Sequence, residues 1–186
     1  IGNHHLFYCT NIHAGETWEE IFSQLKENVP AIKNEFPDFD LFGLGLRLGS
    51  AAANDLIKPE NIKAFKQWLD ENQCYVKALN GFPYGGFHHT RVKDNVYKPD
   101  WTTNERVVYT EQLIKLKEQL MNENTEAGIS TVPLSYKPWM INSCNTTDVF
   151  EACTVNLVKC VQLLYNIRQR TGKIIHIDIE PEPFCL

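Results

Sequence analysis

The segment from residue 175 to residue 185 holds the densest set of side chains that could do chemistry. Three isoleucines alternate there with His176, Asp178 and Glu180. Successive side chains of a β-strand point to opposite faces, so one face is apolar and the other carries an imidazole and two carboxylates. Two prolines follow and end the strand, because proline donates no ladder hydrogen bond. The segment therefore predicts a strand that delivers Glu180 to one end of a parallel sheet, with Glu182 just beyond.

Glu180 is the first candidate for both catalysis and metal binding. Carboxylates are hard ligands that suit Mg²⁺, Mn²⁺ or Zn²⁺. The alternative is a glutamate that pairs with a nearby cation or caps a loop. Glu182 is expected either to hydrogen-bond a substrate or to be a solvated loop residue. Asp178 lies one layer deeper, where a buried charge needs a partner. We expect it to pair with Arg47 or His176 rather than to act in catalysis.

Three further polar residues lie at the ends of strands or in a long loop. Asn80 offers a donor and an acceptor that suit a sugar hydroxyl, although Asn-Gly is also plain turn chemistry. Arg47 could bind a phosphate or carboxylate, or form an internal ion pair with Asp178 or Glu180. His88, in the loop of residues 81–101, could act as a proton carrier or a metal ligand, or be exposed or structural.

The remaining candidates would line a pocket. Asn11 and His13 lie at the end of the first strand, on the same face as Cys9, and are candidates to face a substrate. Tyr84 and Trp139 lie in loops rich in aromatic residues and could form the walls of a sugar-sized site, as could Trp101; such residues also serve simply to pack loops. The sequence contains no Gly-x-Ser-x-Gly, no P-loop and no His-Glu-x-x-His.

Strand-like and helical segments alternate along the chain. Strands are predicted over residues 6–12, 41–48, 75–80, 128–134 and 175–180. Helices with apolar residues at 3.6-residue spacing are predicted over residues 17–36, 59–69, 109–120 and 147–170. Thr17 and Glu20 form a capping box at the start of the first helix. The alternation predicts βαβ units and a parallel sheet.

Two α/β architectures fit this alternation: an open doubly wound sheet and a (β/α)8 TIM barrel. The barrel is favoured because no Gly-x-Gly-x-x-Gly follows the first strand, several strands have one small or polar face, and the long loops follow strand ends. The chain supplies four β/α units and a fifth strand, and a barrel needs eight units. We therefore expect residues 1–186 to be the N-terminal portion of one barrel domain. The alternative is a half-barrel completed by another chain.

Composition narrows the classes of partner. The 186 residues are 43% hydrophobic and 22% charged, with a net charge of −5. An acidic chain does not favour nucleic acid, and no apolar run approaches the ~20 residues of a membrane span. With no signal peptide visible, the expected location is cytoplasmic. Six cysteines lack any Cys-x-x-Cys pair, which favours buried reduced thiols over disulfides or a zinc-thiolate site.

The chain resembles the xylose-isomerase-like TIM barrels in its fifth strand, which ends Ile-Glu-Pro-Glu-Pro. More narrowly, it resembles the EboE family of bacterial metabolite-traffic proteins. The matching stretches are HLFYCTNIHAG (5–15), FGLGLRL (42–48), LNGFPYGGFHHTR (79–91), VYKPDW (96–101), STVPL (130–134) and IEPEPFCL (179–186).

The wider resemblance implies a divalent metal (Mn, Mg or Zn) on Glu180 and a sugar-like ligand. The narrower one implies a role in moving a metabolite, together with other products of the same operon. The leading expectation is a metal-dependent isomerase or epimerase acting on a sugar, sugar phosphate or similar metabolite. The alternatives are a non-catalytic metabolite-binding barrel and, third, an endonuclease-like phosphoesterase.

Overall fold

The computed structural model describes residues 6–38, 40–86, 93–122, 125–140 and 146–186. The strands are β1 (Tyr8–Cys9), β2 (Phe42–Arg47), β3 (Cys74–Asn80), β4 (Glu126–Thr131) and β5 (Ile174–Ile179). The α-helices are α1 (Trp18–Asn34), α2 (Ser50–Leu56), α3 (Pro59–Glu71), α4 (Asn104–Leu120) and α5 (Thr146–Thr171). Short 3-10 turns form η1 (Thr10–Ile12), η2 (Lys93–Tyr97) and η3 (Lys137–Met140). The α/β class predicted from the alternation is confirmed.

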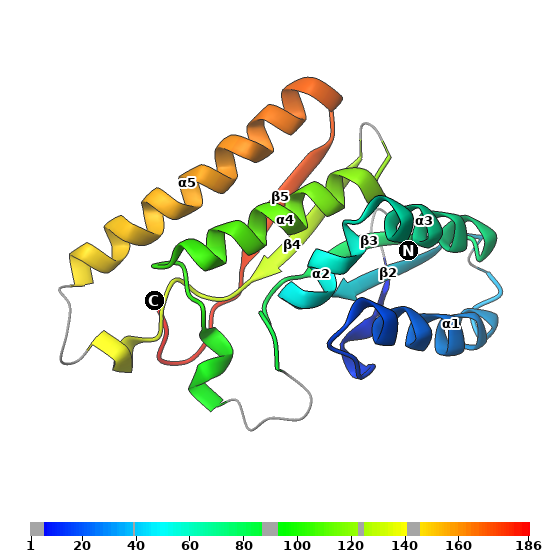
Figure 1. Ribbon diagram of the computed structural model, residues 1–186, viewed down its shortest axis with the longest axis horizontal. Coiled ribbons are helices and arrows are strands. Elements are labelled where there is room, and N and C mark those ends of the chain that lie inside the picture. Colours follow the sequence, from blue (N-terminus) through cyan, green and yellow to red (C-terminus); the bar gives the residue numbers. More distant parts are fainter. Residues whose placement is uncertain (1–5, 39, 87–92, 123–124, 141–145) are drawn as a thin grey trace.

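The strands form one parallel sheet in the order β1-β2-β3-β4-β5, which is also their order in the sequence. A doubly wound sheet instead reverses its strand order at a switch point. Neighbouring helices contact each other in turn, α1 with α2, α2 with α3 and α4, and α4 with α5 (Figure 1). Because βαβ crossovers are almost always right-handed, a sequential order keeps the helices on one face of the sheet.

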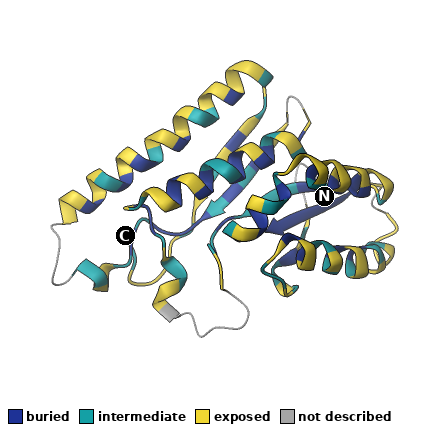
Figure 2. Cartoon of the chain, viewed as in Figure 1, coloured by how far each residue is buried: buried dark blue, intermediate teal, exposed yellow. Residues whose placement is uncertain are grey.

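Alternating side chains separate the two faces of the sheet. On β2 the even-numbered residues Phe42, Leu44 and Leu46 are buried in the core, and on β5 Ile175 is buried as well. In contrast, His176 and Asp178 are exposed on the other face. Figure 2 shows β2 buried along its length, whereas much of α5 is exposed. The sheet therefore has one face covered by helices and one face that is open at β5.

Local signals mark the helix ends, and the capping box predicted at the start of the first helix is confirmed. The Thr17 side chain accepts from the Glu20 backbone while the Glu20 carboxylate accepts from the Thr17 backbone, which is the capping box. Pro59 occupies the first turn of α3, and Gly172 follows α5 with φ 69°, which glycine adopts without strain. Among the described helices, none has both the length and the apolar character needed to cross a membrane.

Three sequence-based expectations were wrong in detail. The first strand, predicted over residues 6–12, ends at Cys9 because the chain turns into η1. Helix α2 was not predicted, since its seven residues give too few turns for an apolar period to show. Cys74, Cys153 and Cys160 are buried free thiols as expected, but Cys9 is exposed.

Candidate functional site

A row of polar residues crosses the sheet near the carboxyl ends of its strands. Arg47 of β2 is in register with Asn80 of β3, Asn80 with Ser130 of β4, and Ser130 with Asp178 of β5. Residues in register on neighbouring parallel strands share a face and lie about 4.8 Å apart. This polar row therefore brings two of the predicted binding residues, Arg47 and Asn80, onto the same level of the sheet as Asp178.

Arg47 lies at the β2 end of the row and is buried, with only 2% of its surface exposed. Its Nη2 donates to the Gly15 carbonyl at 2.6 Å, and its Nη1 lies 3.9 Å from a carboxylate oxygen of Glu16. Burial lowers the pKa of the Arg47 guanidinium, and Glu16 opposes that shift. The guanidinium is therefore held against the loop that follows β1.

The expected ion pair of Arg47 with Asp178 or Glu180 was wrong. Three strand spacings, about 14 Å, separate β2 from β5, which is too far for direct contact. Asp178 instead pairs with His176, the other partner expected for it. Its Oδ1 lies 2.7 Å from Nδ1 of the imidazole.

Asn80 performs the turn role that its sequence suggested. Its Oδ1 accepts from the backbone N–H of Phe82 at 2.9 Å, which turns the chain away from β3. The hydroxyl of Ser130 lies 3.3 Å from the same oxygen and joins β3 to β4. The amide nitrogen of Asn80 forms no hydrogen bond with any described residue, so it remains available to a ligand.

Asn11 and His13 lie beyond the end of β1. The Oδ1 atom of Asn11 is buried without a hydrogen-bond partner among the described residues. Nε2 of His13 lies 2.9 Å from the hydroxyl of Tyr8. Burial lowers the pKa of His13, against an opposing effect of Glu27 on α1. His13 is thereby tied to the first strand by Tyr8.

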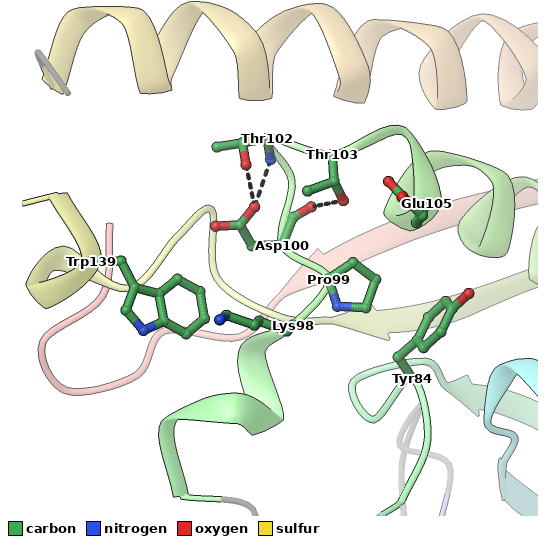
Figure 3. A pocket seen from close by; sticks show the side chains of 8 residues that line it. All are labelled: Tyr84, Lys98, Pro99, Asp100, Thr102, Thr103, Glu105 and Trp139. Atoms are coloured by element: carbon green, nitrogen blue, oxygen red, sulfur yellow. Dashed lines mark hydrogen bonds between the residues drawn. The ribbon is translucent and has the colours of Figure 1, made fainter. Parts of the chain in front are cut away.

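Tyr84 and Trp139 lie on one cavity of about 490 Å³, together with residues that lead into α4 (Figure 3). The amine of Lys98 lies 4.8 Å from the centre of the Trp139 ring. The carboxylate of Asp100 accepts hydrogen bonds from the backbone N–H of Thr102 at 3.0 Å and from the hydroxyls of Thr102 and Ser135. The cavity therefore has aromatic walls, one exposed cation, and a buried carboxylate that orders its rim.

A ladder of four aromatic rings continues from this cavity, and sequence analysis did not single it out. Phe82 contacts Tyr97, Tyr97 stacks on Tyr136 at 5.4 Å, and Tyr136 meets Trp139 edge-on at 5.4 Å. Burial, followed by the nearby Cys185, raises the pKa of Tyr97 to about 12. The density of aromatics in the loops was the available signal. Trp101, expected as a possible wall, is instead fully buried.

The glutamates after β5 and the loop histidine complete the predicted set. The backbone N–H of Glu180 donates to Thr131 at 3.0 Å, which fixes the residue at the strand end. The carboxylate of Glu180 forms no hydrogen bond or ion pair with any described residue, and Glu182 is exposed. His88 lies outside the described residues. Within the described ranges, no three His, Cys, Asp or Glu side chains are placed to hold a metal ion together.

Comparisons with known proteins assign no family to the chain. No family model, no curated protein and no solved structure matches it.

Proposed function

We propose that the protein is a divalent-metal-dependent isomerase or epimerase of a small polyhydroxylated compound such as a sugar or sugar phosphate. The observation that carries the proposal is the polar row at the carboxyl ends of neighbouring parallel strands, with Glu180 next to it at the end of β5. Parallel α/β proteins bind their ligands at this end of the sheet. Amide, hydroxyl and carboxylate groups there match a ligand rich in hydroxyls.

The finer fold that we propose is a TIM barrel of the xylose-isomerase-like type. Sequential strand order supports it, because a barrel adds each strand beside the previous one. The edge of β5 supports it too, since an open edge is normally paired or covered. An apolar stripe on α5 consists of Val158, Val161 and Tyr165, and each of these residues is more than half exposed. A further β/α unit would bury both the edge and the stripe.

Five of the candidate residues have a role in this proposal. Glu180 would be the ligand that this part of the chain gives to the metal, which when bound polarises an adjacent oxygen of the substrate. Asn80 would hold a hydroxyl group of the substrate, and Arg47 would position the loop after β1 beside it through Gly15 and Glu16. Tyr84 and Trp139 would form walls around the ligand in the cavity of Figure 3. Because no three His, Cys, Asp or Glu side chains of the described ranges could hold a metal ion together, further ligands would have to come from outside them.

The test is metal binding by the protein and by Glu180→Gln, with Glu60→Gln as the matched control on the exposed surface of α3. We expect Mn²⁺, followed by elemental analysis and electron paramagnetic resonance, to bind stoichiometrically to wild type and the control. Affinity should fall at least tenfold in Glu180→Gln, because an amide is a much weaker ligand than a carboxylate. Equal Mn²⁺ binding by all three proteins would contradict the metal role.

A second function is a metabolite-binding protein without catalysis, such as the metabolite-traffic family suggests. The aromatic cavity favours it, because stacking rings and a few polar groups suffice to hold a ligand. A protein that binds no divalent metal but retains a small molecule in native mass spectrometry would support this function over the first.

A further inference from the structure

A histidine lies between two carboxylates on the open face of the sheet, one layer below the polar row. Nδ1 of His176 lies 2.7 Å from Oδ1 of Asp178, two residues further along β5. Nε2 of the same ring lies 3.8 Å from Oε1 of Glu126 on β4. The side chains of His176, Asp178 and Glu126 are 45%, 52% and 66% exposed, so an ion from solvent can reach them.

The two distances suit a metal ion with an imidazole ligand. An ionised carboxylate can accept hydrogen bonds but cannot donate them. Asp178 therefore orients the ring of His176 with its proton on Nδ1 and its lone pair on Nε2. Metal-binding histidines almost always donate their other ring N–H to a carboxylate, a backbone carbonyl or water, and Asp178 is such a partner. Zinc lies about 2.0–2.1 Å from nitrogen and about 2.0–2.2 Å from oxygen. One ion can therefore touch Nε2 of His176 and Oε1 of Glu126, which are 3.8 Å apart.

The charges around this histidine also favour a cation. Within the described part of the chain, neither Asp178 nor Glu126 forms an ion pair with a lysine or arginine. The amine of Lys77 donates to the backbone carbonyl of Glu126 at 3.2 Å, and not to its carboxylate. Two carboxylates thus lie next to one imidazole, and a divalent ion would neutralise them.

Gly128 has no side chain, which leaves room for the side chains of His176 and Asp178 beside Glu126. It is in register with His176, and a Cβ atom on it would lie 2.9 Å from Cε1 of that ring and closer still to Oδ2 of Asp178. All four residues belong to two paired strands. Sites built on strands hold their geometry better than sites on loops.

We propose that His176 and Glu126 bind a divalent transition-metal ion of the zinc class, that Asp178 positions the imidazole, and that water completes the coordination. His176 and Glu180 are four positions apart in an extended segment, about 13 Å, so this site is distinct from the proposed catalytic one. It does not depend on the proposed function, since it needs neither Glu180 nor a substrate.

The experiment is calorimetric titration of the protein with Zn²⁺ alone at pH 7.5, together with Co²⁺ absorption spectroscopy. We expect His176→Gln and Glu126→Gln each to weaken Zn²⁺ binding at least tenfold. Asp178→Asn should weaken it about tenfold, because it removes only the group that orients the ring.

Three controls separate this site from other sources of zinc binding. His13→Gln and the exposed Glu60→Gln should leave the His176-dependent binding unchanged. Replacing Cys9 and Cys185 by serine should also leave it unchanged, and the Co²⁺ spectrum should lack a thiolate charge-transfer band. Wild-type Zn²⁺ affinity in both His176→Gln and Glu126→Gln, or loss of binding in the cysteine variant, would overturn the proposal. Circular dichroism of each variant shows that it is folded.

Discussion

At the scale of single residues, Gly128 determines where the side chains of His176 and Asp178 on β5 can lie. The alternation of isoleucine with His176, Asp178 and Glu180 was readable in the sequence, and so was the pairing of Asp178 with His176. The role of Gly128 was not, because it depends on the register of β4 against β5. The expected ion pair of Arg47 with Asp178 or Glu180 was wrong for a related reason. The distance between two strands depends on their order in the sheet.

Gly128→Ala should push His176 and Asp178 out of their present positions. The new methyl group would overlap both side chains, and their partly exposed ends can move aside. We expect a loss of about 1 kcal/mol in the free energy of unfolding, measured by denaturant titration. The ¹⁵N resonances of the His176 ring should shift as its bond to Asp178 lengthens. Gly85→Ala is the control, because no atom lies within 4 Å of the Cβ it would add. Unchanged ring resonances in Gly128→Ala would contradict this account.

Helix α4 organises the loops at the carboxyl end of the sheet through two buried side chains. Arg106 donates to the carbonyls of Pro99 at 2.7 Å, Gly81 at 2.9 Å and Phe82 at 3.4 Å. The hydroxyl of Tyr109 donates to the carbonyls of Leu48 and Pro83. The loops that hold Tyr84 and lead into the cavity are therefore fixed from the helix side.

Arg106→Met should loosen this loop while keeping most of the side-chain volume. Three carbonyls lose their donor, so we expect the free energy of unfolding to fall by about 3 kcal/mol. Proteolysis should become faster within residues 81–101, as read by mass spectrometry of the fragments. Arg170→Met removes an exposed ion pair with Glu118 and should cost less than about 1 kcal/mol. If both variants were equally stable, Arg106 would not be the anchor of the loop.

The sequence predicted the long helices, but it did not predict the buried cationic side chains of α4. Apolar spacing predicted α1, α3, α4 and α5, and a capping residue placed the start of α1. That same reasoning assigns lysine and arginine to the solvent face of a helix. Arg106 and Lys117 are instead fully buried. Only the carbonyl groups that they meet in the folded chain explain their burial, and those groups lie far away in the sequence.

Lys117 makes the stability of the whole molecule depend on pH. Its amine donates to the Val76 carbonyl, and burial, with Lys77 acting in the same direction, lowers its pKa from 10.5 to about 7. Between pH 7 and pH 10.5 the unfolded chain therefore binds more protons at this residue than the folded chain. The contribution of Lys117 to stability rises with pH across this window and is level below it.

Lys117→Met should remove this pH dependence. We expect the variant to be about 2 kcal/mol more stable than wild type at pH 7, since no amine has to be buried. The difference should shrink and then reverse toward pH 10, where the neutral amine of wild type keeps its bond to Val76. Denaturant titrations at pH 7, 8, 9 and 10 check this, with the exposed Lys66→Met as control. A difference that stays constant with pH would contradict the assignment.

Sequential strand order has a consequence for how the chain is made. Each strand of the sheet pairs with the strand that precedes it in the sequence, so no pairing waits for a distant segment. Every newly emerged strand and helix can dock on an edge that is already formed while the ribosome is still translating. Synthesis from the N-terminus can therefore build this sheet one β/α unit at a time.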